Sequence, residues 1–107
     1  MTDPKPLSFT AVRVLQAIAA GTHYGFDIMD ATGLASGTVY PILSRLEAAG
    51  ILRSRWESVA IARRDKRPPR RYYEISPAGS RELARSRAHY ASLGGARAAS
   101  GVRSSRG

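Results

Sequence analysis

The side chains best able to do chemistry are concentrated in one nine-residue stretch, in which six residues are Arg or Lys. Guanidinium and ammonium groups spaced this closely bind phosphates and other polyanions. A solvated loop without a partner is the alternative for any basic run, so the flanking segments must decide between the two. The stretch is Arg63-Arg64-Asp65-Lys66-Arg67-Pro68-Pro69-Arg70-Arg71.

The excess of positive charge lies in the second half of the chain. The 107 residues include 17 Lys or Arg and 8 Asp or Glu, a net charge of +9. Residues 1–50 hold three of these basic and four of the acidic residues, and residues 51–107 hold fourteen and four. This balance favours nucleic acid as the partner, ahead of an anionic membrane. The length allows one small domain with a modest core, which a partner subunit would help to stabilise.

Nothing in the sequence has the spacing of a catalytic or metal site. The chain has no cysteine, which excludes disulfides, thiolate metal sites and cysteine nucleophiles. His23 and His89 lie far apart without ligand partners, and no histidine lies in a motif that could activate Ser36 as a nucleophile. Phosphate-binding and dinucleotide-binding glycine motifs are also absent. We therefore expect neither an enzyme nor a cofactor or metal.

The beginning of the chain, residues 1–7, is predicted to be a flexible arm. It contains Pro4 and Pro6 but no apolar block, so it does not resemble a signal peptide. No apolar run approaches the ~20 residues of a membrane span. The cytoplasm is the expected location.

Two helices are predicted before residue 34. The first begins at Ser8, a good N-cap, and stops at Gly21. Its apolar face is broad enough to be buried on more than one side. The second covers residues 25–32 and stops at Gly33. A short turn then leads into the next helix.

The third helix is predicted to run to about Ala49, with either Ser36 or Thr38 as its N-cap. If Thr38 is the cap, Pro41 lies in the first turn and destabilises the helix little; if Ser36 is the cap, an irregular first turn is expected. The apolar positions follow the spacing of a helix that buries one side. These positions are Val39, Ile42, Leu43 and Leu46.

A period of two replaces the helical period after Gly50. Alternation over residues 51–57 predicts a strand, and residues 71–75 predict a second strand. The basic stretch joins the two strands, which gives a β-hairpin with a long cationic tip; residues 59–62 are a candidate extension of the first strand. Trp56 is expected in the core or against the hairpin, with a ligand pocket as the alternative.

Ser76 and Pro77 form a strong start for a C-terminal helix, an N-cap followed by proline at the first helical position. This helix, residues 77–93, is expected to end at Gly94-Gly95 and to take part in dimerisation. Residues 94–107 are rich in Ala, Ser, Arg and Gly and are predicted to be a disordered basic tail.

The order of these elements predicts a winged helix-turn-helix over residues 8–76. This is a mainly α fold with a small β-hairpin (α+β): three N-terminal helices, a two-stranded wing and a C-terminal helix. The third helix would enter the major groove, and the wing would lie on the adjacent backbone or in the minor groove. Residues expected to contact DNA are Ser36, Thr38, Tyr40, Ser44 and Arg45 on the helix, and Arg63, Arg64, Lys66, Arg67, Arg70 and Arg71 on the wing.

Several short motifs recur together in one known family. They are Tyr24-Gly25-Phe26-Asp27-Ile28, Ser36-Gly37-Thr38-Val39-Tyr40-Pro41-Ile42-Leu43, Arg45-Leu46-Glu47, Gly50-Ile51-Leu52, Trp56-Glu57, Pro68-Pro69-Arg70-Arg71-Tyr72-Tyr73-Glu74-Ile75 and Ser76-Pro77-Ala78-Gly79. Over about residues 9–93 the chain thus resembles the PadR-like transcriptional regulators. The resemblance implies a homodimeric winged-helix repressor on a palindromic operator. It places Thr38, Tyr40 and Pro41 on the recognition helix and Arg70 and Arg71 on the wing.

Three questions stay open at the level of sequence. A winged-helix module that binds RNA or an acidic protein through its basic wing is the alternative function, because a fold does not fix a function. An unidentified small-molecule effector is a further partner, and regulation without an effector is its alternative. The dimer interface is expected to combine the first and last helices, through Val12, Leu15, Leu83, Tyr90 and Leu93.

Overall fold

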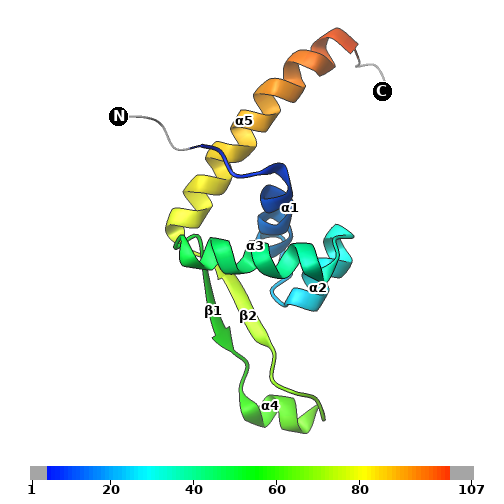
Figure 1. The fold of residues 1–107 in the computed structure, drawn as a ribbon, viewed down its shortest axis with the longest axis vertical. Coiled ribbons are helices and arrows are strands. Elements are labelled where there is room, and N and C mark those ends of the chain that lie inside the picture. Colours follow the sequence, from blue (N-terminus) through cyan, green and yellow to red (C-terminus); the bar gives the residue numbers. More distant parts are fainter. Residues whose placement is uncertain (1–4, 102–107) are drawn as a thin grey trace.

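The computed structural model describes the backbone of residues 5–101 and the side chains of residues 5–93. The elements are α1 (Phe9–Ala19), α2 (Gly25–Thr32), α3 (Ser36–Ala48), β1 (Leu52–Trp56), α4 (Val59–Arg64), β2 (Arg71–Ile75) and α5 (Pro77–Gly101). Helices α1 to α3 form the body, the β1–β2 hairpin projects from it as the wing, and α5 leaves on the opposite side (Figure 1). The predicted winged helix-turn-helix is confirmed.

Helix α1 lies at the centre of the core and is buried on several sides. Val14 and Leu15 are fully buried, and they pack with apolar residues of α2, α3 and β1. The predicted N-cap is present, since the N–H of Ala11 donates to Ser8 Oγ at 3.1 Å. Gly33 ends α2 in the left-handed conformation at φ 74°, and its N–H donates to Met29 O.

The start of α3 differs from both predicted caps. The helix begins at Ser36, and its N-cap is Ala35, whose side chain cannot accept a hydrogen bond. The N–H groups of Thr38 and Val39 both donate to Ala35 O, at 2.9 and 3.0 Å, so the backbone tightens the first turn instead. Pro41 lies inside the helix, one turn further on.

The wing is a twisted pair of antiparallel strands with a third segment at its base. Leu52 pairs with Ile75, and the register continues to Trp56 opposite Arg71. The loop between α1 and α2 adds to this pair, because the N–H of Tyr73 donates to His23 O at 2.8 Å. The hairpin base is therefore held from both sides, and Leu52 and Tyr73 join the core.

The predicted extension of β1 through residues 59–62 is wrong, since these residues belong to helix α4. Ser58 caps this helix, accepting hydrogen bonds from the N–H groups of Ala60 and Ile61 at 3.1 and 3.4 Å. An extended β1 would have needed partners among residues 66–70, where Pro68 and Pro69 have no N–H to donate. A helix satisfies its own backbone within the segment and needs no such partner.

The C-terminal helix begins as predicted, with the N–H of Gly79 donating to Ser76 Oγ at 3.0 Å. The predicted end at Gly94-Gly95 is wrong, because α5 continues to Gly101. The two glycines are followed by a run in which alanine, the strongest helix former, dominates. Residues 94–101 of the predicted disordered tail are thus helical, and residues 102–107 lie outside the described residues.

The predicted flexible arm is attached to α5 at its end. The N–H of Leu7 donates to Ser86 Oγ at 3.0 Å, and the hydroxyl of Tyr90 donates to Leu7 O at 2.7 Å. Leu7 also packs against the core. Residues 1–4 of the arm lie outside the described residues.

Three of the five residues expected at a dimer interface belong to the chain's own core. Val12, Leu15 and Leu83 are 3%, 0% and 6% exposed, because α5 packs across α1 within one chain. Tyr90 is half-buried and Leu93 is exposed, so only these two face outward. In the part of the chain that the structure describes, no helix is both long and apolar enough to cross a membrane.

Candidate nucleic-acid interface

Helix α3 has an apolar side that faces the core and a polar side that faces solvent. Its buried residues are the four predicted from the helical period, Val39, Ile42, Leu43 and Leu46. The opposite side offers hydroxyls, a phenol and a guanidinium, groups that suit base edges and phosphates. All six predicted residues on this helix are exposed: Ser36, Thr38, Tyr40, Pro41, Ser44 and Arg45.

Tyr40 links α3 to the start of α2. Its ring lies against Gly25, where an added methyl carbon would be 2.7 Å from two ring carbons and closer still to the hydroxyl. With any larger residue at this position, the end of the Tyr40 side chain would have to shift. Gly25 therefore fixes where Tyr40, 44% exposed, presents its hydroxyl.

A second polar link joins α3 to the wing. Ser54 Oγ donates to Glu47 Oε2 at 2.5 Å, and Arg71 Nε donates to Ser54 Oγ at 2.9 Å. The guanidinium of Arg71 also lies 3.5 Å from the Glu47 carboxylate. Arg71, predicted to contact DNA, thus has a structural role: it sets the angle of the wing relative to α3.

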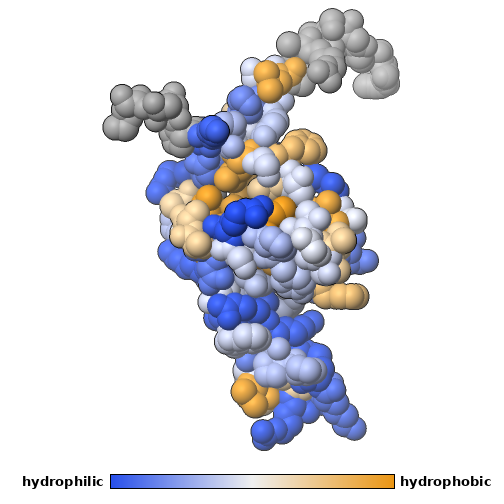
Figure 2. Space-filling model, in the orientation of Figure 1, coloured by the Kyte–Doolittle hydropathy of each residue, from blue (hydrophilic) through white to orange (hydrophobic). Residues whose placement is uncertain are grey.

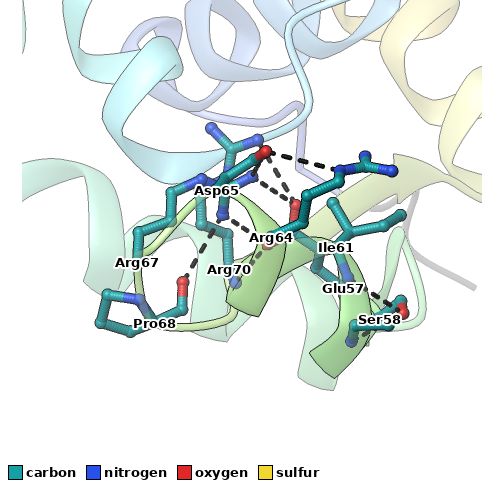
Figure 3. A network of polar contacts seen from close by, with 9 residues as sticks. Glu57, Ser58, Ile61, Arg64, Asp65, Arg67, Pro68 and Arg70 are labelled. Carbon is teal, nitrogen blue, oxygen red and sulfur yellow. Dashed lines mark hydrogen bonds and ion pairs between the residues drawn. The ribbon is translucent and has the colours of Figure 1, made fainter.

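The outer part of the wing, residues 57–70, is organised around one carboxylate. Glu57 accepts hydrogen bonds from Arg67 Nη1 and Nη2 at 2.5 and 2.7 Å and from the Arg70 N–H at 3.1 Å (Figure 3). Arg67 also reaches Asp65 at 3.2 Å, and Arg70 Nη2 lies 3.6 Å from Glu57. We call Glu57, Asp65, Arg67 and Arg70 the tip network.

The tip network holds Glu57 ionised. The hydrogen bonds from Arg67 lower the pKa of Glu57 to about 2, although burial of the carboxylate opposes this shift. The same interaction raises the pKa of Arg67, so the pair stays charged across the whole ordinary pH range. Arg67 and Arg70 are consequently engaged within the wing.

The remaining basic residues of the tip point outward. Arg63, Arg64 and Lys66 are exposed, and the only ion pair among them in the described chain is a 3.7 Å contact between Arg64 and Asp65. Most of the projecting wing is hydrophilic (Figure 2), apart from Val59 and Ile61 on α4. Of the six predicted wing cations, these three are exposed, whereas Arg67, Arg70 and Arg71 are half-buried.

Stacked rings and guanidinium groups hold the wing to the loop between α1 and α2. The Arg70 guanidinium lies 3.9 Å from the centre of the Tyr24 ring, and Arg55 lies 4.1 Å from that of Tyr72. The imidazole of His23 also stacks on the ring of Tyr72, with the ring centres 4.4 Å apart. Such cation–π and aromatic contacts stabilise a hairpin that is otherwise only two strands wide.

An open cavity of about 410 Å³ lies between α2, α3 and the wing. Trp56 contributes to its wall and is 63% exposed, so the expectation that this side chain packs in the core is wrong. The expected alternative, packing against the hairpin, agrees with the contact to Arg71, whose guanidinium lies 5.1 Å from the ring centre. The other lining residues include Tyr24, Phe26, Tyr40, Pro69 and Arg70.

Sequence reasoning missed the two acids that organise this surface, Glu47 and Glu57. The excess of basic residues dominates this region of the sequence, and no structural role was predicted for the two carboxylates. The signal was present, since an acid beside a cationic loop is expected to pair with it. The arginine that pairs with Glu57 depends on α4, because this helix brings Arg67 back to Glu57.

Comparisons with known proteins agree with this architecture. A family model described as "Transcriptional regulator PadR-like family" matches residues 14–85. A PadR-like transcription factor from Bacteroides fragilis shares the fold with a TM-score of 0.68 and 23% identity, over 86% of this chain and 89% of its own. A search of the curated proteins finds no significant match.

Two solved regulators with small-molecule ligands also share the fold. PcaV of Streptomyces coelicolor, solved with its natural ligand, has a TM-score of 0.76 and 18% identity, over 92% of this chain and 66% of its own. BpsR of Bordetella bronchiseptica, whose DNA binding is regulated by 6-hydroxynicotinic acid, has a TM-score of 0.68 and 21% identity, over 96% and 74%. At these identities the structures establish a shared fold.

Proposed function

This chain belongs to the PadR-like family of transcriptional regulators, and we propose that it represses transcription as a homodimer bound to a palindromic operator in the cytoplasm. The observation that carries the proposal is the pairing of an exposed polar helix with a projecting cationic wing in one fold. Helix α3 would read base edges in the major groove, and the wing tip would contact the flanking backbone.

Base recognition is assigned to the exposed side of α3. Thr38 and Ser44 can donate to or accept from base edges, and Arg45 can bind guanine or phosphate. None of these three side chains has a hydrogen bond or ion pair within the described chain. They are therefore free to be satisfied by DNA.

The proposed dimer surface lies where α5 and the start of α1 meet. Phe9 and Leu93 are each 60% exposed, and the Phe9 ring packs edge-on against Tyr90 at 5.5 Å. Tyr90 and Leu93 are one helical turn apart, so the three side chains form one apolar surface. In a dimer that binds a palindromic operator through this fold, the two recognition helices would lie about 34–36 Å apart, in successive major grooves.

A small effector would fit the cavity between α3 and the wing. Aromatic rings and two arginines line this space, which suits a flat anionic molecule. Occupancy would change the contact between Tyr40 and the wing and so alter DNA binding. Trp56, the only tryptophan of the chain, lines the cavity and would report binding through its fluorescence.

Selection of bound duplexes from a random DNA pool, followed by a salt titration on the selected sequence, tests this function. An enriched inverted repeat with half-sites about one helical turn apart is the expected result. Binding that shows no sequence preference and falls steeply with salt would contradict it. The alternative, RNA or an acidic protein as the partner of the wing, would then be favoured.

A further inference from the structure

We propose that Glu57 is a positioning residue for DNA binding: an acidic side chain that the basic wing needs in order to hold its outward cations in place. This inference rests on the proposed function, because it concerns how the wing meets a polyanion. It assigns a role in binding to a residue that would itself repel phosphate.

Glu57 is placed to close the base of the tip. Its side chain is only 5% exposed, and its carboxylate binds both Nη atoms of Arg67 as a fork. Its backbone N–H donates to Arg70 O at 2.7 Å, and its carboxylate accepts the Arg70 N–H in return. One residue therefore ties together both ends of a loop of more than ten residues.

The loop that Glu57 closes has regular hydrogen bonding at both ends of α4. Ser58 caps the start of α4, and at its end the N–H of Arg67 donates to Ala62 O at 3.0 Å while the N–H of Lys66 donates to Arg63 O at 3.1 Å. This is the six-to-one and five-to-two pattern of a Schellman motif, with Lys66 in the left-handed conformation at φ 57°. Arg67 belongs to both the motif and the Glu57 pair, so the pair fixes the orientation of α4.

The three outward-facing cations are positioned by α4 and the Schellman motif that ends it. Arg63 and Arg64 are in the last turn of α4, and Lys66 is the left-handed residue that follows. A helix of six residues is not stable by itself in water. Without the Glu57 pair, we expect α4 to fray and the three cations to spread over many orientations, which lowers their joint contact with phosphates.

Net charge alone predicts the opposite effect of losing Glu57 on DNA binding. Glu57→Gln adds one positive charge to the wing and should strengthen binding to DNA if net charge alone matters. If Glu57 positions the tip, the same substitution weakens binding. Glu74→Gln is the matched control, since Glu74 lies on β2 in the same hairpin and its side chain has no hydrogen bond or ion pair in the described chain.

The test measures affinity for the selected operator and its salt dependence for the wild type and both variants. Glu57→Gln is expected to lower affinity roughly tenfold and to reduce the salt slope by about one to three units, according to how many of the three cations lose their phosphates. Glu74→Gln should bind as tightly as the wild type or more tightly. Glu57→Gln binding that equals or exceeds that of Glu74→Gln would overturn the inference.

Limited digestion with trypsin supplies a readout that does not involve DNA. Cleavage after Arg63, Arg64 or Lys66 should be faster in Glu57→Gln than in the wild type or Glu74→Gln, at a temperature at which thermal unfolding shows all three proteins to be folded. The reversed pair Glu57→Arg/Arg67→Glu should recover part of the protection and affinity that Arg67→Glu loses. Equal cleavage rates in the wild type and Glu57→Gln would overturn the inference.

The two proposals fail in different ways. A wild-type protein without sequence preference contradicts the proposed function, whatever trypsin shows of the tip. A wild type that selects an operator, together with an undiminished Glu57→Gln variant, contradicts only the role of Glu57.

Discussion

The two surfaces proposed to meet DNA differ in how their side chains are held. On α3, Thr38, Ser44 and Arg45 have no polar partner within the described chain, and the helix backbone alone sets their positions. On the wing tip, Arg67 and Arg70 are bound to Glu57, and these pairs set the positions of the others. On α3 the side chains lack internal partners and follow the regular spacing of a helix. On the wing tip the side chains are preorganised by ion pairs within the protein.

This difference shows that the basic residues of one loop are not equally available to an external anion. Half of the six wing cations stabilise the protein itself: Arg67 and Arg70 in the tip network, and Arg71 in the link to Glu47. Fewer cations remain available to an external anion, but the internal pairs hold these cations in defined positions. Preorganisation of this kind strengthens binding by reducing the entropy lost on association.

The largest effect is expected from a change that disturbs the contact between Tyr40 on α3 and Gly25. Gly25→Ala is expected to push Tyr40 out of its position and to lower the free energy of unfolding by about 1–3 kcal/mol, as overpacking does. Urea or thermal unfolding measures the change. Gly37→Ala is the control, because nothing lies within 4 Å of a Cβ there, and it should leave stability unchanged or raise it. Equal effects of the two substitutions would contradict the packing of Tyr40 on Gly25.

Loss of the free guanidinium on α3 should affect discrimination between sequences. Arg45→Ala is expected to lower the preference for the operator over a mismatched duplex by about 1–3 kcal/mol if Arg45 binds a base. Competition binding with both duplexes gives this difference. Arg53→Ala, an exposed cation on β1, removes the same charge away from α3 and should weaken binding to both duplexes alike. Equal losses on both duplexes for Arg45→Ala would assign Arg45 to phosphate.

Acid should remove the internal pairing of the wing and leave α3 unaffected. Because the pKa of Glu57 is lowered from 4.5 to about 2 in the folded chain, its contribution to stability is present above about pH 4.5 and is lost as the pH falls toward 2. The thermal midpoints of the wild type and Glu57→Gln should therefore differ at neutral pH and converge near pH 2. A constant difference across this range would argue against the ionised pair.

The smallest expected effect concerns the end of α4. Lys66 has the left-handed conformation that favours glycine, so Lys66→Gly should be more stable than Lys66→Ala by about 0.5–1 kcal/mol. Both variants lose the same charge, so the comparison isolates the backbone. Each should also reduce the salt slope of DNA binding by about one unit. Identical unfolding midpoints would indicate that the Schellman motif is absent in solution.

Local signals were sufficient for much of the fold. The caps at Ser8 and Ser76 and the left-handed Gly33 act through hydrogen bonds within a few residues, and they were predicted correctly. Helical periodicity also identified the buried side of α3. Residues 59–62 were misassigned because their β-branched and apolar character favours a strand, while the nearby capping by Ser58 and the absence of donors at Pro68 and Pro69 favour a helix.

Features that spacing along the chain does not reveal depend on contacts between distant segments. Burial of Val12 and Leu15 by α5, and exposure of Trp56 beside Arg71, follow from how the elements pack rather than from spacing along the chain. The docking of Leu7 on Ser86 and Tyr90 likewise joins the two ends of the described chain.

By itself, the sequence determined the order of helices and strands, the apolar side of each helix and the concentration of positive charge after residue 50. Periodicity, capping and composition are local properties, and they do not depend on which other segments a segment packs against. Only the tertiary structure decided which cations are free, because an arginine is engaged or available according to which carboxylate the fold brings within a few ångströms. Glu57 and Arg67 are ten residues apart in the chain and meet only because α4 turns the wing back on itself.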